Sequence, residues 1–412
     1  MMKEMAHRLG LGGVLLLAGL LGWRVVVTGL AEYYAERESD DAPAGALRWR
    51  DDQPLALYRQ AQIEAARDPA VAERLFQSAA WANPTDARVY MALAELWAKA
   101  GRTSAAIEMA ERADELGPLR SPVLMGSAEF WRSQGRLDRM LARWSMLLRT
   151  RPETSTQLYP VLLRLAEDSA GQALLKPLLD DPPEWWNGFF VYAARNAQQS
   201  ETVVFLYQAR QRHGELPVED EQRAYLDRLW RDGRWGEAYL AWLGGLDEQQ
   251  IKALGAIYNG GFEAPLTGVG FDWRAPPVHG ATVELAPTYG VRGDQALHVS
   301  FNGQRVRFKH VSQYLFLDPG RYRLQGRVRP DGLQTERGLR WTVRCAPEDP
   351  LLAESERFLG SDEWRAFVVE FVVPASGCLM QVLRLELDGR VELDFEVDGG
   401  VWFDDLSAVR LE

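Results

Sequence analysis

The side chains that most often carry out catalysis are sparse in this sequence and follow no recognised spacing. The 412-residue chain has no G-x-S-x-G nucleophile elbow, no H-E-x-x-H zinc helix, no glycine-rich phosphate loop and no C-x-x-C pair. Its five histidines are dispersed, with no carboxylate or nucleophile beside them in a familiar pattern. A glycosidase needs only two carboxylates about 5–10 Å apart, an arrangement that a sequence does not reveal. We therefore predict a protein that is not an enzyme, with glycan hydrolysis as the least favoured alternative.

Cys345 and Cys378 are the only two cysteines of the chain, and both fall in a segment that reads as β-strands. Two thiols are too few for a four-ligand zinc cluster. In an oxidising compartment, a bond between them would close a loop of about 33 residues and would stabilise the fold by roughly 3–4 kcal/mol. We predict this disulfide, with two separate buried thiols as the alternative.

Length and charge limit the class of protein. A chain of 412 residues exceeds the size at which one hydrophobic core keeps growing, so two or three folded units are expected. The formal net charge is −11, whereas nucleic-acid binding needs a clustered basic surface that releases counterions from phosphate. The sequence contains no basic stripe, and we expect no nucleic-acid partner.

Residues 9–31 form an almost wholly apolar segment. A helix over these 23 residues would extend about 34 Å, enough to cross a bilayer core of about 30 Å. Lys3 and Arg8 precede the segment, and acidic residues follow it. This asymmetry predicts a single membrane span, with residues 1–8 in the cytoplasm and the bulk of the chain outside.

Two features of the segment bear on whether it is retained as a membrane anchor or cleaved as a signal peptide. Arg24 interrupts the apolar run, and its charge is tolerated in a span only if the side chain extends to the outer interface. Gly29 and Ala31 place small residues where a signal peptidase would cut. We favour a retained anchor over a cleaved signal peptide, followed by an exposed acidic tether over residues 32–52.

A 34-residue repeat organises the next part of the chain. Pro84, Pro118 and Pro152 are spaced by 34 residues twice over, which is the period of the tetratricopeptide repeat, a hairpin of two helices. Large and small apolar residues alternate within each unit, and Gly101 lies at an expected turn between helices. Each hairpin has an apolar face that it can bury only against a neighbour, so the units should stack. The three units cover residues 53–86, 87–120 and 121–154.

The repeat pattern weakens after residue 154 and returns over residues 219–246. Helical periodicity therefore predicts a helical repeat domain over residues 53–255. The resemblance to tetratricopeptide arrays implies a groove that binds a peptide or a partner protein, although the sequence singles out no groove residue.

Beyond residue 255 the hydrophobic period changes to two. In ALHVSFN, for example, Leu297, Val299 and Phe301 share one face. About eight such runs, separated by Gly, Pro and Asp, predict two antiparallel sheets packed as a sandwich over residues 256–412. The predicted fold class is multidomain, α then β: an N-terminal transmembrane helix, a solenoid of helical hairpins and a C-terminal β-sandwich.

The segment VELDFEVD alternates over eight residues and predicts one of these strands. Its apolar side chains would point inward, and its acidic side chains would form a solvated outer row. The inward set is Val391, Leu393, Phe395 and Val397, and the outer row is Glu392, Asp394, Glu396 and Asp398.

The ends of the β-domain carry a family resemblance. The segment opens with NGGFE at residues 259–263 and closes with WFDDL at residues 402–406. This resembles the jelly-roll carbohydrate-binding modules appended to xylanases and glucanases, which typically begin N-G-x-F-E and end F-D-D. The match covers only the terminal strands, so it bears more on the fold than on the ligand.

The resemblance implies two kinds of site. In such modules the opening and closing strands can share a structural calcium, which needs oxygen ligands; the alternative is that these groups only make hydrogen bonds at strand ends. Sugar binding uses aromatic faces near strand ends, although each of these residues can also belong to the core. The calcium positions are Gly261, Glu263, Asp404 and Asp405, and the aromatic candidates are Trp273, Tyr289, Tyr314, Trp364 and Trp402.

The combination of anchor, repeats and sandwich resembles bacterial proteins associated with surface-polysaccharide assembly. It implies a single-pass protein of the bacterial inner membrane with its bulk in the periplasm. We expect a scaffold whose repeats bind envelope proteins and whose sandwich binds polysaccharide during exopolysaccharide assembly or export. The alternative is a purely protein-binding scaffold in which the sandwich serves as a docking domain.

Overall fold

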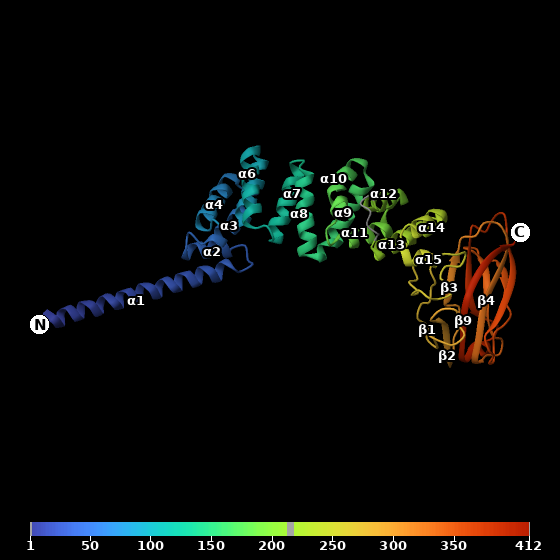
Figure 1. Cartoon of the computed structure of the whole chain (residues 1–412). Coiled ribbons are helices and arrows are strands. Elements are labelled where there is room, and N and C mark those ends of the chain that lie inside the picture. Colours follow the sequence, from blue (N-terminus) through green and yellow to red (C-terminus); the bar gives the residue numbers. More distant parts are fainter. Residues whose placement is uncertain (1, 212–217, 412) are drawn as a thin grey trace. The chain divides into compact units, whose positions relative to one another are not determined.

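The computed structural model describes residues 2–211 and 218–411. They divide into two compact units, one up to Trp186 and one from Asn187 onward. The first unit is helical, and the second joins the last helices to a β-sandwich (Figure 1). The expected order, α then β, is confirmed.

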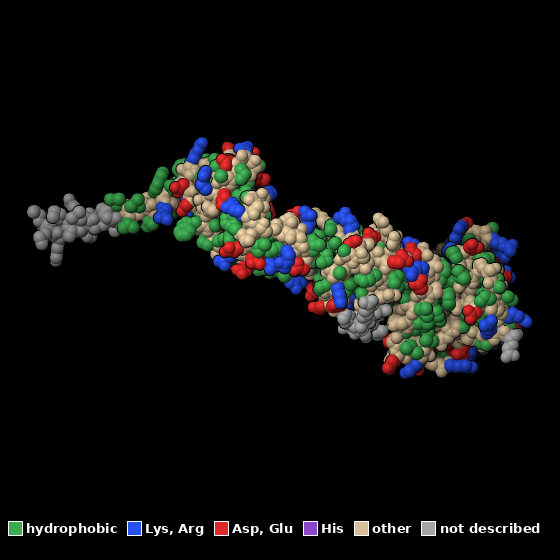
Figure 2. Space-filling model, turned by 90° about the horizontal axis from the view of Figure 1, so that it is seen from above, with side chains coloured by type: hydrophobic (Ala, Val, Ile, Leu, Met, Phe, Trp, Pro, Cys, Tyr) green, Lys and Arg blue, Asp and Glu red, His purple; other side chains and the backbone are tan. Residues whose placement is uncertain are grey.

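Helix α1 (Met2–Ala35) contains the apolar segment. Residues Leu15–Ala35 are long and apolar enough to cross a membrane, a property shared by anchors and signal sequences. The large apolar side chains between Leu15 and Val26 are exposed (Figure 2). The N-terminal apolar helix is therefore confirmed, and the choice between anchor and signal sequence stays a prediction.

The stretch expected to be an exposed tether is partly folded. Residues 42–49 form helix α2 (Ala42–Trp49), whose Ala46 packs in a small core with Ala35 and Ala56. The Arg59 guanidinium donates to the carbonyl oxygens of Ala35, at 2.8 Å, and Arg37. Small side chains allow this close packing, so the end of α1 is joined directly to the repeats.

Six helices then form three hairpins that match the predicted repeats. Helices α3, α4 and α5 begin at side-chain caps; the Asp68 side chain, for example, accepts hydrogen bonds from the backbone N–H groups of Ala70 and Val71. Gly101 adopts a left-handed φ of 73° in the turn between two helices, which a residue with a Cβ atom would adopt only with strain. The helices are α3 (Pro54–Glu64), α4 (Pro69–Ala82), α5 (Ala87–Lys99), α6 (Thr103–Leu116), α7 (Ser121–Ser133) and α8 (Leu137–Thr150).

Helices continue to Lys252, close to the predicted end of the helical region. Pro160 and Pro177 lie inside two of them, where the sequence pattern was weakest. The elements are η1 (Pro152–Thr154), α9 (Ser155–Glu167), α10 (Ser169–Asp180), α11 (Trp186–Asn196), α12 (Ser200–Gln211), α13 (Glu219–Arg231), α14 (Trp235–Leu243) and α15 (Glu248–Lys252).

The β-domain is a sandwich of two antiparallel sheets. One sheet has the strand order β1-β2-β9-β4-β7 and the other β3-β8-β5-β6. The core between them is rich in aromatic rings, with Trp341 and Phe403 in edge contact at 5.2 Å. The strands are β1 (Ala281–Ala286), β2 (Ala296–Arg305), β3 (Val311–Leu315), β4 (Gly320–Gln334), β5 (Leu339–Ala346), β6 (Leu351–Glu354), β7 (Arg365–Val373), β8 (Met380–Leu387) and β9 (Glu396–Leu411).

Cys345 and Cys378 form a disulfide bond, as predicted. Both sulfur-bearing side chains are buried in the sandwich core.

The prediction of a strand over VELDFEVD is wrong in its first half. Residues Glu392–Phe395 form a turn of 3-10 helix, η2, because the Asp394 carboxylate accepts hydrogen bonds from the backbone N–H groups of Arg390 and Val391. Val391 and Leu393 are consequently 60% and 59% exposed instead of inward, and Asp394 is buried instead of solvated. Strand β9 begins only at Glu396.

A buried carboxylate lies directly after β8. Asp388 is 6% exposed, and its carboxylate oxygens lie 3.1 Å from Arg337, 3.3 Å from Arg340 and 2.9 Å from Arg357. Burial alone would raise the pKa of Asp388, but the charge of Arg340 and the hydrogen bonds from Arg357 and Arg337 outweigh it, so the pKa lies below its usual value.

The substitution Asp388→Asn is expected to lower the free energy of unfolding at pH 7 by about 2 kcal/mol, less than for a fully buried pair because the arginines are partly exposed. Because the folded-state pKa is depressed, this stabilisation is present above about pH 4 and is lost as the pH falls through the folded pKa. Urea unfolding at pH 7 and pH 3 measures both effects. The exposed Glu370, paired with Arg321 and Arg323, gives a matched control in Glu370→Gln. An undiminished difference at pH 3 would contradict this account.

Candidate functional site

Three of the five aromatic candidates come together on the sandwich. Tyr289 lies in the loop between β1 and β2, Trp364 immediately precedes β7, and Trp402 lies on β9. The guanidinium of Arg329, on β4, lies over all three rings, at 4.6 Å from the Tyr289 centroid, 5.8 Å from Trp364 and 5.1 Å from Trp402. Sequence segments more than a hundred residues apart therefore meet at one point.

Strand register builds this cluster. Glu284 on β1 is paired with His298 on β2, His298 with Trp402 on β9, and Trp402 with Arg329 on β4. Directly opposed residues of antiparallel strands point to the same side. The neighbours of Trp402, Val401 and Phe403, are fully buried in the core, so the row faces outward. We call Glu284, His298, Trp402, Arg329, Trp364 and Tyr289 the outer-face row.

Hydrogen bonds fix the row in place. The Arg329 guanidinium donates to the Thr288 hydroxyl at 2.9 Å and to the Tyr289 hydroxyl at 3.3 Å. The Trp364 indole N–H donates to the Tyr289 carbonyl oxygen at 2.7 Å. His298 Nδ1 lies 3.2 Å from a Glu284 carboxylate oxygen. These bonds hold the aromatic rings at defined positions rather than leaving them as loose surface side chains.

The aromatic rings of the outer-face row differ in how much of their surface is free to contact a ligand. The Trp402 ring stacks on the His298 imidazole, with centroids 4.0 Å apart and an angle of 16° between the planes, so one of its faces is covered. Tyr289 is 59% exposed and Trp364 is half-buried. The free aromatic surface is thus mainly that of Tyr289, with Trp364 beside it. Arg329 is 9% exposed and places a cation against the ring faces.

Trp273 and Tyr314, the other two candidates, do not belong to the row. Trp273 is fully buried, packs against Phe262 and Trp341, and donates its indole N–H to the Asn259 carbonyl oxygen at 3.2 Å. Its prediction as a sugar-binding residue is therefore wrong. Tyr314 lies on β3, where its ring contacts the helices, so it has no access to the row.

The carboxylates at the calcium positions make hydrogen bonds and ion pairs within the chain, and the calcium site stays a prediction. Glu263 accepts from the backbone N–H groups of Asp294 and Gln295, and an Asp405 oxygen lies 3.3 Å from Arg292. In the described parts of the chain, no group of three or more His, Cys, Asp or Glu side chains could hold a metal ion.

The remaining two positions give calcium no further support. Gly261 lies in a turn, and Asp404 is buried and accepts from the Asp405 backbone N–H at 2.7 Å. Burial raises the pKa of Asp404. Hydrogen bonds at the strand ends, the alternative considered for these residues, account for the positions of these carboxylates.

The last helical hairpin packs against the sandwich within the second unit. The Trp230 ring on α13 contacts Tyr314 at 4.9 Å, and Tyr239 on α14 stacks on Phe316 at 5.1 Å. Gly270 has a left-handed φ of 61°, and a Cβ atom there would lie 2.3 Å from the Trp242 ring. Glycine therefore allows the loop of the sandwich to approach the helix closely.

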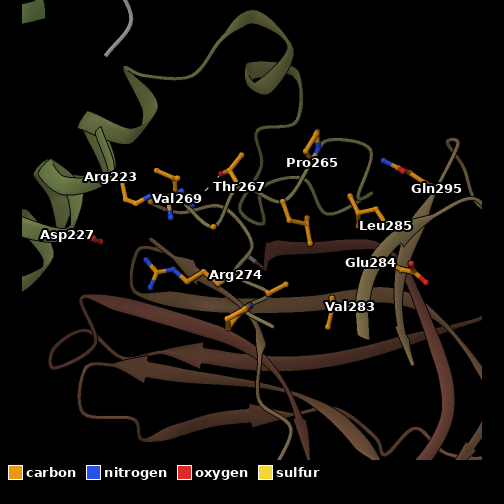
Figure 3. A pocket seen from close by; sticks show the side chains of 15 residues that line it. Arg223, Asp227, Pro265, Thr267, Val269, Arg274, Val283, Glu284, Leu285 and Gln295 are labelled. Carbon is orange, nitrogen blue, oxygen red and sulfur yellow. Dashed lines mark hydrogen bonds between the residues drawn. The ribbon is translucent and has the colours of Figure 1, made fainter. Parts of the chain in front are cut away.

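A cavity of about 770 Å³ lies between α13, the loop over residues 265–276 and strand β1 (Figure 3). Arg223, Asp227 and Arg274 lie at one end of the cavity, and Glu284 and Gln295 lie at the other. Glu284 also belongs to the outer-face row, so the cavity and the row share one residue.

No curated protein matches the sequence. The sandwich is similar to a CBM4 structure, with 14% identity and a TM-score of 0.29, over 38% of this chain and 99% of that chain. It is also similar to the CBM22-1 xylan-binding domain of Xyn10C from Paenibacillus barcinonensis, with 14% identity and a TM-score of 0.26, over 37% and 92% of the two chains.

Another part of the chain is similar to MamA, with 16% identity and a TM-score of 0.25, over 32% of this chain and 79% of that chain. TM-scores and identities this low give no information on ligands. Residues 64–139 match the family model described as tetratricopeptide repeat. The helical region of this chain therefore contains tetratricopeptide repeats.

Proposed function

We propose that this protein is a non-enzymatic scaffold of the bacterial envelope, held at the inner membrane by α1, with its repeats binding protein partners and its sandwich binding polysaccharide. The observation that carries the proposal is the outer-face row. A sugar is bound by aromatic faces that cover its C–H surface, together with a few fixed polar groups that select its orientation. The row supplies aromatic rings, a guanidinium, an imidazole and a carboxylate on one surface.

The position of Arg329 argues that the row is more than a packed surface. It lies on the outer face of a sheet, where long polar side chains normally extend into water, yet it is 9% exposed. Its Nε atom and the indole nitrogen of Trp402 have no hydrogen-bond partner in the structure. Buried polar atoms without partners cost free energy, and a bound hydroxyl group or bridging water would satisfy them.

The other parts of the chain support a place in the envelope. A disulfide bond is typical of oxidising compartments, and α1 provides an apolar helix of membrane-spanning length. Tetratricopeptide repeats stack into arrays whose surfaces bind partner chains. Together they favour a protein that brings a polysaccharide close to an envelope assembly, during exopolysaccharide synthesis or export.

Binding of the full-length chain, in detergent, to xylan, β-glucan and bacterial exopolysaccharide tests the proposal. Tyr289→Ala and Trp364→Ala should each weaken binding about tenfold, because each removes aromatic surface worth about 1 kcal/mol or more. Trp81→Ala is the matched control, since Trp81 lies on α4 in the other unit and is 89% exposed. It should bind as the unaltered chain does.

The outcomes separate three functions. Binding that depends on Tyr289 and Trp364, without release of shorter sugars, supports the proposal. Release of reducing sugars would instead show a glycan hydrolase. No binding to any polysaccharide would favour the docking alternative, for which the sandwich offers a second cavity of about 740 Å³ with the exposed Leu359 and Leu393 in its wall.

A further inference from the structure

A cation without a close partner lines the larger cavity. Arg274 is half-buried, and its guanidinium lies 4.1 Å from the Trp230 centroid and 4.7 Å from the Tyr314 centroid. Its Nε atom has no hydrogen-bond partner, and among the residues described no carboxylate lies within 4 Å of it. Burial lowers the pKa of Arg274, although the guanidinium stays charged at neutral pH.

The surroundings of Arg274 do not neutralise it. Asp227 lies at the same end of the cavity (Figure 3), and its negative charge opposes the effect of burial on the pKa of Arg274 without outweighing it. Arg223, beside it, adds a second positive charge and is bound to Glu219 on its own helix at 2.9 Å. A partly desolvated cation is costly unless an anion faces it. An anion from outside the chain would therefore reduce the free-energy cost of the partly buried Arg274 charge.

The walls that hold Arg274 are fixed without any ligand. Its backbone exchanges hydrogen bonds with Ser312 on β3, at 2.7 and 2.9 Å. The Asp272 carboxylate accepts from both the backbone N–H and the hydroxyl of Thr267, at 2.7 and 2.6 Å, which closes the loop on itself. Gly270 lies against Trp242. The cavity is therefore preformed, and its volume of about 770 Å³ falls in the range of small-molecule sites, about 300–1,000 Å³.

The charge and polarity of the lining residues change along the cavity. Beyond the arginines, its wall is apolar, with Pro265, Leu266 and Val283. Glu284 lines the far end, where its carboxylate points away from the arginines (Figure 3) and lies 3.2 Å from His298 in the outer-face row. A sugar chain lying on the outer-face row would thus enter the cavity past Glu284. It would contact the positive charges of the arginines only at the opposite end of the cavity.

We infer that the cavity binds the carboxylate group of an acidic sugar, a uronate residue of the polysaccharide held by the outer-face row, with Arg274 as its main anchor and Arg223 as a second. The inference rests on the proposed function and adds the class of glycan. A planar guanidinium binds a carboxylate through two parallel hydrogen bonds, and the stacking on Trp230 and Tyr314 holds the Arg274 plane in one orientation.

The test compares polygalacturonate with its methyl-esterified form and with neutral xylan, using the full-length chain in detergent. The unaltered chain should bind polygalacturonate at least tenfold more tightly than the ester. Arg274→Gln should remove this preference and reduce the salt dependence of binding, whereas Arg274→Lys, which keeps the charge but not the paired hydrogen bonds, should lose part of it. Arg223→Gln should have a smaller effect, because Arg223 is exposed and already paired.

The controls distinguish this inference from the proposed function. Arg112→Gln, an exposed arginine on α6 paired with Glu115, should change nothing. Hydrogen exchange of β2 and β9 checks that Arg274→Gln stays folded. Neutral xylan bound through Tyr289 and Trp364, with no preference for the acid over the ester, would overturn the inference and leave the proposed function standing. Equal loss of acidic and neutral polymers in a folded Arg274→Gln chain would overturn it as well.

Discussion

A chain in which Cys345 and Cys378 are both replaced by alanine is expected to lose about 4 kcal/mol of the free energy of unfolding of the sandwich. The bond joins residues 33 positions apart, so its loss frees a long loop in the unfolded chain. Both side chains are also buried, so the alanines leave unfilled space in the core. Hydrogen exchange of the β5 and β8 amides, which reports on the sandwich separately from the repeats, measures the loss.

Reduction provides the internal control for this prediction. Treatment of the unaltered chain with dithiothreitol should lower the protection of β5 and β8 toward that of the double variant, while the variant itself should not respond. The helices of the first unit should keep their protection in both cases, since they share no bond with the cysteines. An unaltered chain that keeps its protection after mass spectrometry shows both cysteines reduced would contradict the predicted contribution.

The repeats were predictable because their signals are local. The repeated prolines Pro84, Pro118 and Pro152 each follow the end of a helix by two residues. Gly101 turns the chain with a φ of 73°, and an aspartate such as Asp68 caps the next helix. Each of these effects acts over a few residues. A 34-residue period of such local signals is therefore nearly sufficient to predict a stack of helical hairpins.

The sequence predictions are wrong where the local structure is determined by distant contacts or by competing hydrogen bonds. VELDFEVD has the period of a strand, yet the short-range hydrogen bonds of Asp394 fold its first half into a turn. Tyr314 has the position of a surface aromatic at a strand end, but Trp230 of α13 covers it. Alternation alone describes neither the competition of a side chain with the backbone nor the packing of a separate element.

The candidate site was predictable in part for the same reason. Tyr289, Trp364 and Trp402 could be selected as aromatic residues near strand ends. Arg329 and His298 could not, because their roles follow from pairings with Trp402 across β4, β9 and β2. A single sequence contains no record of strand register over a hundred residues. The cavity beside Arg274 was equally hidden, since it is formed by a helix, a loop and an edge strand.

The substitution Trp273→Ala is expected to lower the free energy of unfolding of the sandwich by about 4 kcal/mol. Trp273 is fully buried among Phe262 and Trp341, and its removal leaves both a cavity and an unpaired carbonyl oxygen at Asn259. Protection of the β2 and β9 amides from hydrogen exchange should fall accordingly. Trp273→Phe, which keeps most of the ring volume, should lose clearly less.

This prediction decides how any loss of polysaccharide binding must be interpreted. Trp273→Ala would weaken binding only by unfolding the surface that carries the outer-face row, so binding and exchange protection should fall together. Trp364→Ala, in contrast, removes a half-buried ring of the outer-face row. Polysaccharide binding should then fall, while the hydrogen-exchange protection of β2 and β9 stays close to that of the unaltered chain. If Trp273→Ala instead lost binding with full protection, the buried tryptophan would have to reach the ligand, and the outer-face row would be the wrong surface.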